Sequence, residues 1–176
     1  MKNMDNKRGG IDMKTVIIKP HHFMDIFKLY GTGIEEFVPD QKMEHDFYAI
    51  ANAIIKNSYL LCQLTIEGDD ICKPCHYYQN HQCQDTLFHI QGISKKGQYN
   101  QLLDQRIIEL YQLYNTQYQV LELCQIFYRH HELIAKVWKE EDDQQVEKRR
   151  DFFVKGVEKY FFKYKDDVMT KYFEDI

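Results

Sequence analysis

The chain has 176 residues, of which 44% are hydrophobic and 14% aromatic, so it can bury the core of one domain and is not intrinsically disordered. Its formal net charge of −4 offers no basic excess for nucleic acid and no polybasic cluster for an anionic membrane surface. No apolar run approaches the roughly 18 residues of a membrane span, and the polar start "MKNMDNKRGGIDMK" lacks the apolar stretch of a secretory signal.

These features predict where the chain resides and how it is organised. We expect a cytoplasmic protein, whose reducing surroundings disfavour structural disulfides. We also expect residues 1–12 to form a flexible tail and 13–176 a single metal-binding domain, with the motifs in 13–98 and a helical half in 99–176. The cysteine count is odd and one dense cluster stands out, which favours metal or thiol-redox chemistry.

Two strands and two helices are predicted before the cysteine-rich loop. A β-branched run predicts a strand over 15–19, and apolar residues at helical spacing predict a helix over 20–30. An amphipathic stripe then predicts a helix over 40–57 with Asp40 as its N-cap. Alternating apolar residues predict a second strand over 59–66.

From about Asn100 onward the pattern is helical. One helix follows Asn100, and Thr116 is a candidate cap for a second that continues through "HHELIAKVW". The charged stretch "KEEDDQQVEKRR" opens a final helix and is read as its solvated face. The sequence therefore predicts a single α+β domain, mostly α-helical, with short strands and a cysteine-rich metal loop.

The loop "EGDDICKPCHYYQNHQC" carries the clearest chemical signal. Cys72 and Cys75 form a C-x2-C pair, and Cys83 follows after seven residues. Thiolates at this spacing can converge on one metal ion while backbone amides bond to the sulfurs. Two alternatives remain open: a thioredoxin-type "CKPC" pair, although no helix clearly follows it and no later proline exists, or free thiols in a polar loop.

A metal site of this kind needs a fourth ligand, and several residues compete for it. Cys124 and Cys62 both share an element face with apolar residues, so each also fits the core. His22 and Asp25 are three residues apart and share one helix face. The candidate ligands are Cys72, Cys75, Cys83 and Cys124, with Asp25, His22 and Cys62 as alternatives, and His21 and His22 as candidates for binding an anionic ligand or the metal.

The motifs taken together resemble a family of small bacterial and archaeal proteins of unknown function that are suspected of binding iron–sulfur clusters. The resemblance rests on "PHH" at residues 20–22, on "GTG" at 31–33, and on "DDICKPC" followed by Cys83. It implies an iron–sulfur cluster. Asp25 stands where family members commonly carry cysteine, and Cys124 is alone where many have a second C-x2-C pair. These departures leave the cofactor as an iron–sulfur cluster or zinc.

The sequence thus predicts a metal-binding protein with a structural, electron-transfer or sensing role, and no identifiable partner. A zinc-stabilised interaction module is the alternative, and a thiol-redox protein is a further one. His45 and Asp46 also suggest a metal-dependent hydrolase with His22 as an upstream ligand. On the predicted helix, however, His45 lies opposite the apolar stripe and Asp46 at its flank, so the two do not converge on an ion.

Overall fold

Two small sheets organise the computed structural model, which describes residues 15–174. Strands β1 (Thr15–Ile18), β2 (Leu61–Leu64) and β5 (Gln117–Gln119) form a sheet in the order β1-β2-β5. β1 runs parallel to β2, and β5 runs antiparallel to it. Strands β3 (Tyr78–Gln79) and β4 (Gln82–Cys83) form a separate hairpin. The predicted tail over 1–12 lies outside the described residues.

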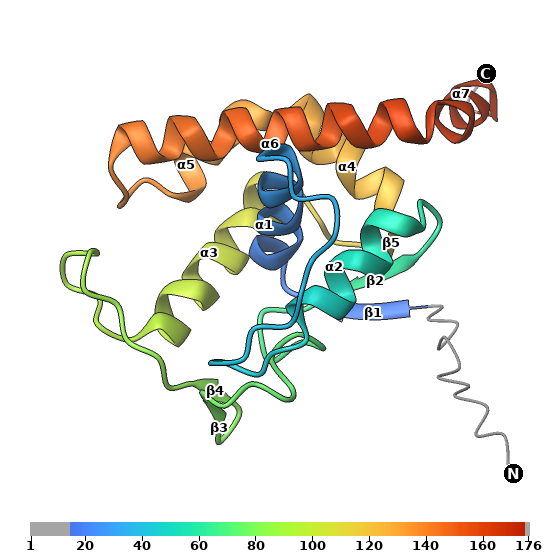
Figure 1. Cartoon of the computed structure of the whole chain (residues 1–176). Coiled ribbons are helices and arrows are strands. Elements are labelled where there is room, and N and C mark those ends of the chain that lie inside the picture. Colours follow the sequence, from blue (N-terminus) through green and yellow to red (C-terminus); the bar gives the residue numbers. More distant parts are fainter. Residues whose placement is uncertain (1–14, 175–176) are drawn as a thin grey trace, which may run out of the picture.

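Helices supply most of the fold, which confirms the predicted mostly α-helical α+β class. In Figure 1, α6 crosses the top of the molecule and α1 lies beneath it, with α3 to one side. The helices are α1 (Pro20–Gly31), α2 (Phe47–Lys56), α3 (Lys96–Leu110), α4 (Val120–Arg129), the 3-10 turn η1 (His131–Leu133), α5 (Ile134–Val137), α6 (Asp143–Lys163) and α7 (Lys165–Glu174).

Aromatic side chains join the helices in the core. The Phe23 ring of α1 lies 5.8 Å from the ring of Phe127 in α4, and the Phe27 ring lies 5.1 Å from that of Tyr160 in α6. All four side chains are fully buried. Edge-on and tilted aromatic pairs of this kind contribute about 0.5–1.5 kcal/mol each beyond the area they bury, so α1 is fixed firmly between α4 and α6.

Two glycines allow α1 and α6 to cross with their backbones in direct contact. A Cβ atom placed on Gly156 of α6 would overlap with the Phe27 carbonyl oxygen and lie 3.0 Å from the Gly31 nitrogen. A Cβ atom on Gly31 of α1 would overlap with the Phe152 carbonyl oxygen. Neither glycine is needed for its backbone angles, since both are within helices. They are needed because only a residue without a side chain fits this crossing.

The predicted helix over 40–57 begins only at Phe47, so the prediction of Asp40 as its N-cap is wrong. The Asp40 carboxylate instead accepts hydrogen bonds from the backbone N–H groups of Lys42 and Met43, at 2.9 and 2.8 Å. This closes a turn, and Glu44 then adopts a positive φ of 56°. A short polar side chain that bonds to its own backbone stabilises a turn in competition with a helix.

The prediction that Thr116 caps the next helix is also wrong. Strand β5 follows Thr116, and α4 begins at Val120 after Gln119 and Glu122 form a reciprocal capping box. The predicted continuation through "HHELIAKVW" breaks at His130, where φ is −124°, into η1 and α5. The final helix begins as predicted, and the Asp142 carboxylate caps it by accepting from the N–H groups of Gln144 and Gln145. It does not continue unbroken to the end of the predicted stretch, because α6 ends before Tyr164 and α7 follows.

None of the helices in residues 15–174 is long and apolar enough to cross a membrane.

Candidate metal centre

The parallel pairing of β1 and β2 brings the first turn of α1 beside the loop that follows β2. Both strands end at the same edge of the sheet, with Ile18 opposite Leu64. The loop then curls back along β1, because the Ile17 N–H donates to the Asp70 carboxylate at 2.7 Å and the Asp70 N–H donates to the Ile17 carbonyl at 3.0 Å. Segments about 50 residues apart in sequence therefore meet here.

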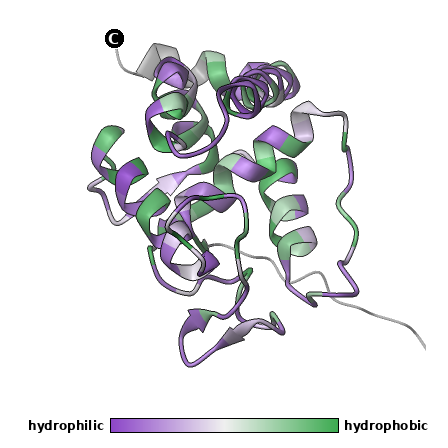
Figure 2. Cartoon of the chain, turned by 90° about the vertical axis from the view of Figure 1, so that its left-hand side faces the viewer, coloured by the Kyte–Doolittle hydropathy of each residue, from purple (hydrophilic) through white to green (hydrophobic). Residues whose placement is uncertain are grey.

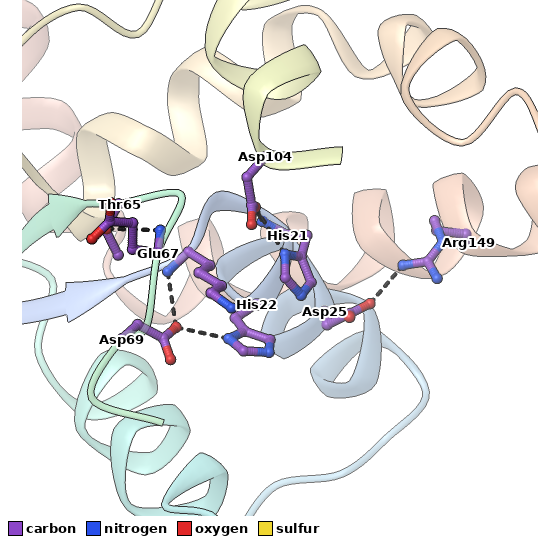
Figure 3. A network of polar contacts seen from close by, with 9 residues as sticks. His21, His22, Asp25, Thr65, Glu67, Asp69, Asp104 and Arg149 are labelled. Atoms are coloured by element: carbon purple, nitrogen blue, oxygen red, sulfur yellow. Dashed lines mark hydrogen bonds and ion pairs between the residues drawn. The ribbon is translucent and has the colours of Figure 1, made fainter. Parts of the chain in front are cut away.

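His22, Asp69 and Cys72 form a group whose ligand atoms all lie within 4.8 Å of one another. The His22 Nδ1 atom lies 2.7 Å from Asp69 Oδ2, which also accepts the Lys19 backbone N–H at 2.9 Å (Figure 3). The other carboxylate oxygen, Oδ1, accepts the Cys72 N–H at 3.0 Å. Asp69 therefore connects β1, α1 and the cysteine-rich loop through one fully buried side chain.

The charge states of His22 and Asp69 are set by their burial and by the charges around them. Burial acts to raise the pKa of Asp69, but the adjacent His22 and the backbone hydrogen bonds hold it far below its usual value. Burial and the neighbouring His21 lower the pKa of His22. A neutral imidazole therefore donates its Nδ1–H to an ionised carboxylate, and Nδ1 can bind a metal in place of this hydrogen bond once the proton moves to Nε2.

Cys72 is half-buried, and burial together with the Asp69 charge raises the pKa of its thiol to about 12. Its carbonyl oxygen accepts the Cys75 N–H at 2.9 Å, which closes the C-x2-C turn. Cys75 and Cys83 are also half-buried, but neither belongs to the His22–Asp69–Cys72 group. The structure thus brings one of the three loop thiols together with α1.

The two remaining cysteines lie in the hydrophobic core. Cys62 of β2 and Cys124 of α4 are both fully buried, and burial raises the pKa of each thiol. The structure therefore places both candidate ligands in the core and outside the group that contains Cys72.

His21 faces away from this group and anchors α1 to α3. Its Nδ1 atom lies 2.8 Å from Asp104 Oδ1, which also accepts the His21 backbone N–H at 2.9 Å. Asp104 has no solvent exposure. The His21 and His22 rings are in contact, with centroids 4.2 Å apart. The two histidines thus use separate aspartates, and His22 alone lies in the group that could hold a metal.

Asp25 forms an ion pair with Arg149 of α6 at 2.5 Å (Figure 3) and a second one with Lys28 at 2.9 Å. The Arg149 guanidinium also lies over the Trp138 ring, 4.3 Å from its centroid. Burial acts to raise the pKa of Asp25, but the two cations hold it far below its usual value. The carboxylate that stands at the expected cysteine position therefore ties α1 to α6.

Replacing Asp25 by Asn should reduce the free energy of unfolding by about 1–3 kcal/mol at pH 7, because it leaves a half-buried guanidinium without its counter-charge. Since the folded-state pKa of Asp25 lies below its unfolded value, the ion pair stabilises the fold above that value. The difference between variant and wild type should therefore shrink as the pH falls below about 4. Urea unfolding of both proteins at pH 7 and pH 3.5 measures it, and an undiminished difference at the lower pH would contradict the assignment.

His45 and Asp46 precede α2 and do not lie within it, so their predicted positions on a helix were wrong. The Asp46 N–H donates to the Ile71 carbonyl at 3.1 Å, which ties this segment to the cysteine-rich loop. Both residues lie outside the His22–Asp69–Cys72 group.

Asp69 was absent from the candidate ligands predicted from sequence. Its signal was its place three residues before Cys72, where an aspartate commonly bonds to the following backbone N–H groups. A comparison with protein-family models finds no match, and neither do comparisons with curated proteins and with solved structures.

Proposed function

We propose that the chain binds one zinc ion through His22, Asp69 and Cys72, and that the ion holds the cysteine-rich loop against α1. The proximity of the three ligand atoms, all within 4.8 Å of one another, carries this proposal. Zinc accepts imidazole nitrogen, carboxylate oxygen and thiolate sulfur in one site, whereas iron–sulfur clusters are held mainly by thiolates.

The hydrogen bonds around the group support a prepared site. The Asp69 Oδ2 and His22 Nδ1 atoms are 2.7 Å apart, so a zinc ion that replaces the proton between them would be held by both. Zinc is four-coordinate in most protein sites, so three ligands leave one position for water or for Cys75 at the end of the C-x2-C turn. A zinc ion here serves as a structural tie, in agreement with a zinc-stabilised interaction module.

An iron–sulfur cluster is the second candidate, and the closed C-x2-C turn favours it. The resemblance of "DDICKPC" and Cys83 to a family suspected of binding such clusters points the same way. A cluster would require the loop to bring Cys75 and Cys83 to Cys72. Metal analysis with a UV–visible spectrum of protein purified without oxygen distinguishes the two: brown protein with iron and sulfide supports a cluster, and colourless protein with one zinc per chain supports the zinc site.

Zinc binding should release one proton per chain between pH 6 and 8. The Cys72 thiol is protonated over this range because its pKa is about 12, whereas burial and the neighbouring His21 lower the pKa of His22 and favour its neutral form. The apparent zinc affinity should therefore rise about tenfold per pH unit. Competition titrations with a chelator of known pH dependence measure the slope. A slope of zero would contradict ligation by Cys72, and a slope of two would contradict the three-residue site by adding a second thiol.

A further inference from the structure

A polar cavity of about 520 Å³ lies beside the metal group, and the proposed zinc ion does not occupy it. Its walls come from the loop after β2, the β3–β4 hairpin and the first turns of α3. The two short strands of the hairpin are mostly hydrophilic in Figure 2, where they lie at the foot of the molecule. A volume of this size is typical of a pocket for a small molecule.

Lys19 provides a positive charge in the cavity wall. The residue is only 6% exposed, and it lines the cavity. Within residues 15–174 its ammonium makes no ion pair or hydrogen bond, whereas its backbone N–H donates to Asp69 and its carbonyl accepts the Phe23 N–H. The Nζ atom is not enclosed by protein, so the ammonium is open to the cavity. An anion in the cavity would supply the missing partner.

The first turn of α3 adds hydrogen-bond donors to the opposite part of the wall. This helix has no side-chain N-cap and no acidic residue in its first turn, but Asp85 lies at its start: the Lys96 N–H donates to the Asp85 carbonyl at 3.0 Å, and the Lys96 ammonium pairs with the Asp85 carboxylate at 2.8 Å. Gly97 and Gln98 of this turn line the cavity. Gly97 packs on the hairpin, since a Cβ atom there would lie 2.9 Å from the Cys83 carbonyl oxygen.

The remaining lining is charged or rich in amides. Lys19 and Lys95 contribute two cations, against the single carboxylate of Glu67. Around them lie side chains that donate and accept hydrogen bonds, namely Asn80, Gln82, Gln84, Gln98 and Gln101. Amide groups of this kind suit the hydroxyl groups of a ligand, and the excess of cations suits an anionic group.

We propose that this cavity binds a small hydroxylated molecule that carries a phosphate group, with the phosphate at Lys19 and the hydroxyl groups on the amide-lined wall. Phosphate binding by a lysine together with an uncapped helix N-terminus is physically favoured. Lys19 and α3, which form two of the walls, are placed by β1 and by the His21–Asp104 contact as well as by the loop that the proposed zinc ion would hold.

The test is a titration of the full-length, 15N-labelled chain, with and without zinc, followed by amide shifts in NMR spectra. The probes are glucose 6-phosphate, inorganic phosphate and glucose. We expect saturable shifts at Gly97 and Gln98 with glucose 6-phosphate at a Kd below about 1 mM, weaker binding of phosphate at the same amides, and none with glucose. Absence of saturable shifts at these amides with both phosphate compounds would overturn the proposal.

Lys19→Met should weaken binding of glucose 6-phosphate about tenfold or more, because it keeps the aliphatic stem and removes the charge. Lys136→Met is the matched control, since Lys136 is exposed on α5 and does not line the cavity. Equal weakening in both variants would show a non-specific charge effect and refute the site. Gln98→Trp fills the cavity from an exposed position and should also abolish binding. Unchanged binding of glucose 6-phosphate by the Gln98→Trp variant would refute the proposed site, even if the Lys19→Met variant does not fold.

Discussion

Replacing His22 by Ala is expected to weaken zinc binding by about 100-fold or more, because it removes the nitrogen ligand and leaves a carboxylate and one thiol to hold the ion. Cys72→Ser should have a similar effect. Both side chains are half-buried, so neither substitution opens a large void in the core. Isothermal titration with zinc, paired with metal analysis of the purified variants, measures the loss.

Residues of the same type outside the group provide the controls. His81→Ala and Cys83→Ser should leave zinc affinity within about threefold of wild type, because neither residue belongs to the group. This pattern also separates the two metal proposals. An iron–sulfur cluster held by the loop thiols would be lost in Cys83→Ser and retained in His22→Ala, and that result would overturn the zinc site.

Replacing Gly156 by Ala should destabilise the fold by about 3 kcal/mol or more, because the new methyl group overlaps with backbone and not with a side chain that can turn away. The helices α1 and α6 would have to separate, and the aromatic contacts of Phe27 with Tyr160 would be loosened with them. For a chain of this size we expect the Tm to fall by about 6–12 °C. Thermal and urea unfolding followed by circular dichroism measure both quantities.

Lys148→Ala is a suitable control for that experiment, since Lys148 is an exposed residue on the same helix. It should change the free energy of unfolding by no more than about 0.5 kcal/mol. Alanine has a higher helix propensity than glycine by about 1 kcal/mol, so a Gly156→Ala protein as stable as wild type or more stable would show that the two backbones do not touch.

The sequence by itself determined the elements whose signal is local. The strand after Thr15, the helix from Pro20 and the long final helix follow from periodicity and from residues that start or stop a helix, and the structure has all three. Cys124 was predicted as a metal ligand and Cys62 as an alternative ligand, although their apolar settings also fit the core, where both are fully buried. A local pattern is enough to predict these elements, because side chains that recur every 2 residues share one face of a strand and those that recur every 3.6 residues share one face of a helix.

The predicted start of a helix was wrong where one side chain stabilised a turn in place of the helix. Asp40 lies at the head of an amphipathic pattern, so the pattern alone favours a helix from that point. Its carboxylate bonds to the next two N–H groups instead, and the helix begins seven residues later, at Phe47. The sequence around Asp40 does not distinguish a helix start from a turn, because aspartate serves both as a helix cap and as a turn former.

Only the tertiary structure decided the metal group and the cavity. The parallel pairing of β1 with β2 places Asp69 against His22, and the packing of α1 on α6 lets Asp25 form an ion pair with Arg149. No spacing along the chain encodes these contacts, because they join segments separated by 47 and 124 residues. Sequence thus identified His22 and Cys72 but missed Asp69, and the fold brought the three together, since contact between distant segments depends on how whole elements pack.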